Sequence, residues 1–173
     1  MRYPDPLFLG QAFSYVSAGN NTNTKHQGEF MGLLSFFTSK NESTAKADII
    51  KNIDIMAAIN AHLKWKVRLD KYVNGTSDEQ LDPQLICMDD QCVLGKWIHG
   101  PAKEYFMDDP KFKILLEDHA KFHMVAAQVV NLVLQDNVAN AHSVLRGSYL
   151  KASRQVVKDL TDIGKQFHAD KAA

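Results

Sequence analysis

The sequence predicts an all-α protein, an antiparallel helical bundle of four main helices plus a short one that carries a cysteine. From residue 44 onward, apolar residues recur every three or four positions, as they do on the buried face of a helix. Helix start and stop signals bracket these stretches, and no alternating pattern of β-strands competes with them. A chain of 173 residues can also bury one core without disulfide bonds.

Four of these helices can be placed by residue. The first spans about Thr44–Val73 and ends at the stop signal Asn74-Gly75. Residues 75–87, which contain Asp82-Pro83, read as a loop, and a short helix then follows Asp89-Asp90 and ends before Gly100-Pro101. The inward stripe of the first helix consists of Ile55, Ile59, His62, Leu69 and Val73.

The third and fourth helices carry the longest apolar stripes. Asp109 is placed to cap the third helix, and Pro110 suits its first turn. The fourth helix spans about Val138–Phe167. The stripe of the third consists of Phe112, Leu115, Leu116, His119, Phe122, His123, Ala126, Val130 and Val133, and that of the fourth of Leu145, Tyr149, Ala152, Val156, Leu160 and Ile163.

The chain divides into three parts. Residues 1–47 form an N-terminal extension, which we expect to be disordered or in part an artefact of the gene start, because residues 1–30 are rich in Gly, Pro and Asn without a sustained period. Residues 48–168 form the helical bundle, and residues 169–173 a flexible C-terminus.

Composition excludes several classes of partner. Twenty basic and twenty acidic residues give no net charge, so the composition shows no excess of basic residues of the kind that binds nucleic acid. No secretory signal is present at the N-terminus, and no apolar run reaches the length of a membrane span. We therefore expect a cytoplasmic protein, in which two cysteines favour metal ligation or free thiols over disulfides.

Three histidines and one cysteine predict a metal site inside the bundle. His119 and His123 stand one turn apart on the third helix, and His62 lies in the apolar face of the first. Cys92 lies at the start of the short helix, where unpaired N–H groups favour a thiolate. Desolvating three imidazoles in one core is costly unless they share a partner. Zn²⁺ accepts thiolate and imidazole ligands in a tetrahedron, so these four residues predict an internal zinc site.

Other cysteine and histidine residues are weaker ligand candidates. Cys87 is the rival of Cys92, but it lies in the predicted loop with no helical stripe behind it. The histidines that we interpret as non-ligands are His26, His99, His142 and His168, of which His142 lies nearest to an inward stripe.

Three motifs resemble a known family. They are the strings AHLKWK at 61–66, CVLGKWI at 92–98 and HAKFH at 119–123. Together they resemble the chemoreceptor zinc-binding domain, known as CZB, whose pattern is a His followed by an aromatic residue, a Cys-x-aliphatic-Gly-x-Trp segment and an H-x-x-x-H pair. The resemblance covers roughly residues 48–168. It implies a zinc-binding bundle with His62, Cys92, His119 and His123 as ligands, and with Trp65, Gly95 and Trp97 beside the site.

The resemblance also implies a function. Domains of this family are cytoplasmic regulatory modules attached to chemoreceptors or diguanylate cyclases, they pair about a two-fold axis, and they are associated with sensing zinc and oxidants. The sequence has neither a signalling coiled coil nor a cyclase domain, so we expect a stand-alone copy that forms a homodimer and acts on a chemoreceptor or a diguanylate cyclase in chemotaxis or cyclic-di-GMP control. Cys92 is the expected target of hypochlorous acid.

An enzymatic function is not expected. A zinc hydrolase of the H-E-x-x-H type needs a glutamate after the first histidine, where this chain has Ala120. A di-iron bundle needs Glu three residues before each histidine, where Leu116 and Ala120 stand. The alternative to a sensor is a structural or interaction protein whose zinc only stabilises the bundle.

Overall fold

The computed structural model describes residues 44–51 and 53–172, with side chains described as far as residue 167. Across these residues every regular element is a helix, which confirms the all-α class. The predictions for residues 1–43 and for the side chain of His168 lie outside the described part, and the domain boundaries at 48 and 168 stay predictions.

The elements follow one another with short connections. Helical residues 44–51 come first, and the elements after them are α2 (Ile55–Val73), α3 (Pro83–Cys87), α4 (Val93–His99), α5 (Pro101–Phe106), α6 (Pro110–Leu134), α7 (Val138–Val144), the π-helical η1 (Leu145–Tyr149) and α8 (Leu150–Ala172).

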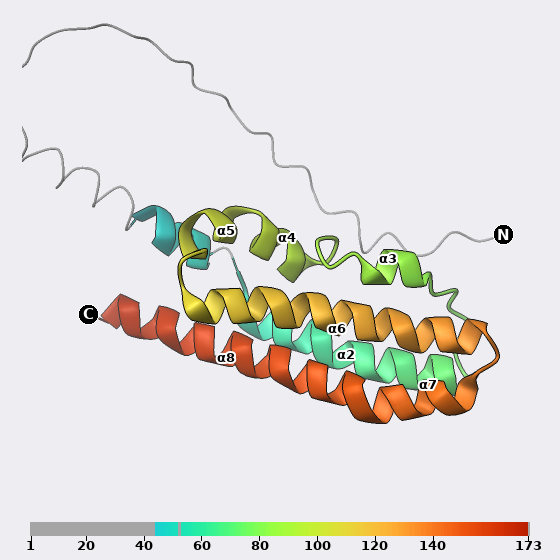
Figure 1. The fold of residues 1–173 in the computed structure, drawn as a ribbon. Helices are drawn as coiled ribbons and strands as arrows, with labels where there is room; N and C mark the ends of the chain where they lie inside the picture. Colours follow the sequence, from blue (N-terminus) through green and yellow to red (C-terminus); the bar gives the residue numbers. More distant parts are fainter. Residues whose placement is uncertain (1–43, 52, 173) are drawn as a thin grey trace, which may run out of the picture. The chain divides into compact units, whose positions relative to one another are not determined.

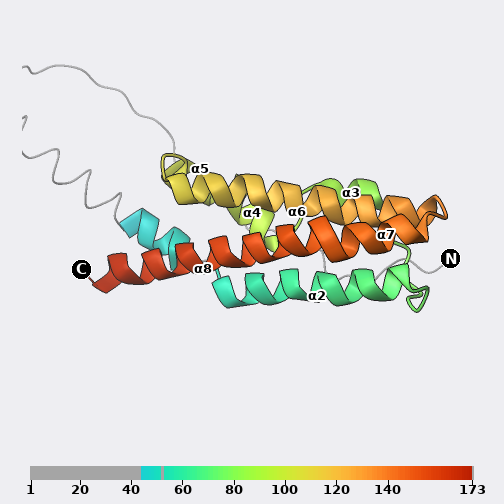
Figure 2. The same ribbon diagram turned by 60° about the horizontal axis from the view of Figure 1, so that its bottom comes forward.

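The bundle is antiparallel in chain order. In both views α2 and α6 run in the same direction, and α7, η1 and α8 together run in the opposite one (Figure 1, Figure 2). The segment from α3 through α4 to α5 runs back between the end of α2 and the start of α6 (Figure 1). In the described residues three long helical rods are therefore joined by a fourth antiparallel segment made of short helices, rather than by a fourth long helix.

Two of the predicted elements differ from the structure. The helix expected over 44–73 is interrupted before α2, because the Asp54 side chain caps α2 by accepting a hydrogen bond from the Ala57 N–H at 2.8 Å. The loop expected over 75–87 is wrong at its end, where Asp82 accepts a hydrogen bond from the Gln84 N–H and starts α3. Helix α5 was not expected, although Pro101 occupies its first turn.

The other helices lie where the sequence predicts them. Asp109 caps α6 by accepting hydrogen bonds from the N–H groups of Lys111 and Phe112. The fourth predicted helix is continuous but contains the π turn η1, whose Leu145 and Tyr149 are both buried. No helix among the described residues is long and apolar enough to cross a membrane. The buried faces of α2, α6 and α8 thus meet in one core that surrounds the predicted metal ligands.

Candidate metal centre

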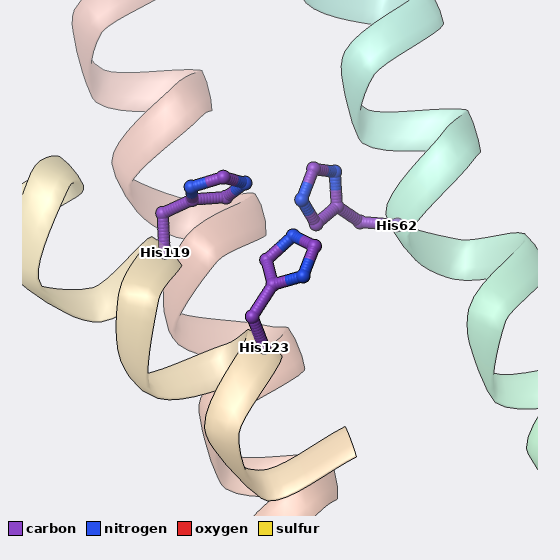
Figure 3. A group of neighbouring side chains, drawn as sticks. All are labelled: His62, His119 and His123. Atoms are coloured by element: carbon purple, nitrogen blue, oxygen red, sulfur yellow. The ribbon is translucent and has the colours of Figure 1, made fainter. Parts of the chain in front are cut away.

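Three histidines from two rods meet inside the bundle. His62 on α2 faces His119 and His123 on α6 (Figure 3), and one ring nitrogen from each lies within 4.8 Å of the others. All three side chains are buried. The 3.6-residue repeat explains the placing, because positions four apart on α6 lie on one face. The structure therefore brings together the three histidines that the sequence singled out.

Backbone carbonyls fix the orientation of two of these rings. His62 Nδ1–H donates to the Ala58 carbonyl at 2.7 Å, and His123 Nδ1–H donates to the Ile86 carbonyl at 2.7 Å. A neutral imidazole with a proton on Nδ1 presents a lone pair on Nε2. The His123 Nε2 atom is buried without a hydrogen-bond partner. Outer partners of this kind are typical of histidines that bind metals.

Cys92, in the short-helix segment, contacts the cluster through His119. Its Sγ lies 3.4 Å from His119 Nε2, and as the N-cap of α4 it accepts a hydrogen bond from the Gly95 N–H at 3.2 Å. The rival Cys87 is exposed at the end of α3, next to the residue whose carbonyl binds His123. The structure thus places Cys92, and not Cys87, against the histidine cluster.

The separations within the site can be compared with those of a tetrahedral zinc ion. Zn–S bonds of about 2.3 Å and Zn–N bonds of about 2.0–2.1 Å would place sulfur and nitrogen roughly 3.5 Å apart and two nitrogens roughly 3.3 Å apart. The observed separation of 3.4 Å between Cys92 Sγ and His119 Nε2 matches the first value. The three histidine nitrogens, within 4.8 Å of one another, need a closing movement of at most about 1.5 Å to match the second. The orphaned nitrogen of His123 is consistent with a zinc ion at this site.

Burial keeps the ligand groups neutral in the absence of a cation. Burial lowers the pKa of His62 and His123, and burial together with the neighbouring His123 and His62 lowers the pKa of His119 to about 2. Burial also raises the pKa of the Cys92 thiol, although the Gly95 N–H opposes this. Without a metal, desolvation outweighs the hydrogen bond from the helix, so the deprotonation of Cys92 depends on a bound cation.

The three neighbouring motif residues have distinct structural roles. Trp97 is buried among aromatic rings, and its Nε1–H donates to the Ile49 carbonyl at 3.1 Å. Trp65 is half-buried, with the guanidinium carbon of Arg68 lying 4.4 Å from its ring centroid. A Cβ at Gly95 would lie 1.7 Å from the Asp89 carbonyl oxygen. Gly95 thus permits close approach of the preceding turn rather than of another helix.

Asp89 is a polar neighbour of the cluster that sequence reasoning missed. Its carboxylate lies near His119 and contacts His99, which lies outside the three-histidine cluster. Its position three residues before Cys92 was visible in the sequence, but only as a helix start signal. His142 is half-buried on α7 and also lies outside the cluster.

Comparison with known families agrees with this geometry. Residues 62–130 match the model of the chemoreceptor zinc-binding domain. Over these residues the chain is therefore similar to that family. No curated protein and no solved structure matches the chain significantly.

The matched residues contain the histidine cluster. The match begins at His62 and ends within α6, so it includes all four predicted ligands. Zinc is the cofactor that this match indicates, and the buried His62, His119 and His123 with the adjacent Cys92 form a cluster suited to it. Helices α7 and α8 follow the matched residues and supply part of the core around the cluster.

Proposed function

We propose that His62, Cys92, His119 and His123 bind one zinc ion per chain, and that the domain is a non-catalytic sensor whose oxidant-sensitive group is Cys92. The observation that carries this proposal is the position of Cys92 Sγ, 3.4 Å from His119 Nε2. A site with four protein ligands leaves no coordination position for an activated water, which favours sensing over hydrolysis.

The ligand set can be tested by metal content. His62→Ala combined with His119→Ala, and Cys92→Ser alone, should lower the zinc content or affinity of the purified protein, because each removes ligands from a tetrahedron. His142→Ala and Cys87→Ser are matched controls that should retain one zinc per chain. Wild-type protein without zinc in elemental analysis, or full retention by the double variant, would contradict the ligand set.

The sensing step is a two-electron oxidation of the Cys92 sulfur. Zinc, when bound, supplies the positive charge that keeps this buried sulfur a thiolate at neutral pH. The thiolate reacts with hypochlorous acid to give a sulfenic acid and chloride, so that sulfur gains oxygen and loses two electrons while chlorine gains them. The sulfenic acid is a poorer zinc ligand than a thiolate, so we expect the segment that carries Cys92 to separate from the histidines.

The oxidation step has a direct test. Zinc-loaded protein is treated with stoichiometric hypochlorous acid, zinc release is followed with a colorimetric chelator, and modified residues are located by mass spectrometry. We expect zinc release to parallel modification of Cys92. Exposed Met107 and Met124 are internal controls for surface oxidation. Retained zinc and reduced Cys92 after those methionines have oxidised would refute the sensor and leave a zinc that only stabilises the bundle.

The proposed output comes from the resemblance to the family. We propose that the domain forms a homodimer and acts on a chemoreceptor or a diguanylate cyclase, in chemotaxis or cyclic-di-GMP control. Exposed apolar side chains on one face of α2, namely Met56, Leu63 and Val67, are consistent with a protein contact on that face. Sedimentation velocity over a range of concentrations tests the dimer, and a monomer at every concentration would exclude it.

A further inference from the structure

A carboxylate lies between the metal centre and the surface. Asp89 Oδ2 is 2.8 Å from His99 Nε2 and 3.7 Å from His119 Nδ1. The side chain of His119 is fully buried, that of Asp89 is 21% exposed and that of His99 is 33% exposed. Exposure to solvent therefore increases from His119 through Asp89 to His99.

The ring of His119 lacks the acceptor that the other two histidines have. His62 and His123 each donate Nδ1–H to a backbone carbonyl, whereas His119 Nδ1 is buried with no hydrogen-bond partner. Binding a metal through Nε2 requires the proton on Nδ1, and a buried N–H without an acceptor costs about 1–3 kcal/mol. The Asp89 carboxylate is the acidic group facing this atom, and a movement of less than about 1 Å brings it within hydrogen-bond distance.

The net charge of a zinc site with these ligands also favours a role for Asp89. Zn²⁺ with one thiolate and three neutral imidazoles carries a net charge of +1, and a buried unpaired charge is costly. Asp89 carries the compensating negative charge beside His119. Neighbouring Asp90 is exposed, and its side chain accepts a hydrogen bond from the Gln91 amide rather than facing the histidines.

We propose that Asp89 is a positioning residue of the zinc centre, that it accepts a hydrogen bond from His119 Nδ1–H and so holds the ring with Nε2 toward the metal, and that His99 anchors the carboxylate from outside. This inference rests on the ligand set proposed above. Asp89 would then raise the affinity for zinc although it is not one of the four ligands, because groups that accept a hydrogen bond from a metal-binding histidine contribute strongly to affinity.

Zinc affinity of charge-matched variants tests the proposal. Measured by competition with a chelator, Asp89→Ala should bind zinc about 10–100-fold more weakly than wild type, the range typical for loss of an outer partner. Asp89→Asn keeps an oxygen acceptor and loses the charge, so its loss should be smaller. Asp90→Asn removes the same charge one residue away and should bind like wild type.

A double-mutant cycle tests the role of His99. His99→Gln should weaken zinc binding less than Asp89→Ala does, and adding it to Asp89→Ala should cause no further loss, since the anchor acts only through the carboxylate. Additive losses would overturn the anchoring role.

A spectroscopic measurement separates positioning from a general loss of stability. In zinc-loaded wild type, long-range ¹H–¹⁵N spectra of the His119 ring should show Nδ1 protonated, with slow exchange of that proton. Asp89→Asn, which should keep the fold, is expected to accelerate this exchange while the His62 and His123 signals stay unchanged. Unchanged affinity and unchanged exchange in both Asp89 variants would overturn the proposal. If instead the variant that combines His62→Ala with His119→Ala retains zinc, the ligand set itself is wrong.

Discussion

Replacing Gly95 with alanine should damage the metal centre through the backbone alone. A Cβ at this position would lie 1.7 Å from the Asp89 carbonyl oxygen and 2.8 Å from its carbon, where real Cβ contacts are not closer than about 3.0 Å. Backbone atoms cannot rotate away as a flexible side chain can. Either the turn that contains Asp89 or the first turn of α4 must therefore move by more than about 1 Å.

The displacement has a cost that can be estimated. Overpacking of this kind costs about 1–3 kcal/mol, and losing the hydrogen bond from the Gly95 N–H to Cys92 Sγ costs about 0.5–1.5 kcal/mol more. Alanine in a helix otherwise gains about 0.5–1 kcal/mol over glycine. We expect a net loss of about 2 kcal/mol in the free energy of unfolding and at least a tenfold loss in zinc affinity, because the Cys92 sulfur moves with its cap.

The assay is chemical denaturation with and without zinc, together with chelator competition. Gly147→Ala is the matched control, since a Cβ there meets nothing within 4 Å. It should leave zinc affinity unchanged and leave stability equal or slightly higher. Equal stability and equal zinc affinity of the Gly95→Ala protein and wild type would refute the steric argument.

Three further perturbations have defined outcomes. Zinc at 100 times its dissociation constant should stabilise the protein by about 2.7 kcal/mol, and melting curves with a chelator should show the corresponding drop. Trp97→Phe should cost about 1–2 kcal/mol in denaturation experiments, because the buried Ile49 carbonyl loses its donor. Burial and the adjacent Asp118 raise the pKa of Asp159 from 3.8 to about 6. The folded state therefore keeps the proton on Asp159 at pH values where the unfolded state has lost it. The stability that this proton contributes is fully present below pH 3.8 and is lost as the pH rises toward 6. Asp159→Asn should therefore stabilise the protein by about 1 kcal/mol at pH 7, with allowance for solvent screening, and by less at pH 4; an equal effect at both pH values would exclude this explanation.

The long helices were predictable because their signals are local. On α6 the cap, the proline of the first turn and the apolar stripe all agree, so its position followed from the sequence. The break before α2 did not, because Asp54 competes as a cap within a stretch whose apolar period continues on both sides. Helices α3 and α5 are only one or two turns long, too short for a periodic pattern to distinguish them from a loop.

The residues of the metal cluster could be predicted from the sequence, but the groups that hydrogen-bond to them could not. Apolar stripes place histidines on inner faces, so the meeting of three imidazoles followed from helix geometry. Their outer partners depend on contacts between distant segments, such as the Ile86 carbonyl on α3 that accepts from His123 on α6. The pKa of the Cys92 thiol also depends on such contacts, since a helix start is visible in sequence and the burial of its side chain is not.

The segment from α3 to α5 gives the bundle one side that differs in kind from the other three. Long rods open only when much of the core opens with them, whereas short helices joined by turns can detach as a local cooperative unit at a small fraction of the global free energy. This segment holds Cys92, Asp89 and the carbonyl that orients His123, so three contacts with the cluster would open together. Hydrogen exchange should then show α3 to α5 as the least protected helices without metal, and occupancy of the centre would set how often that side of the protein is folded.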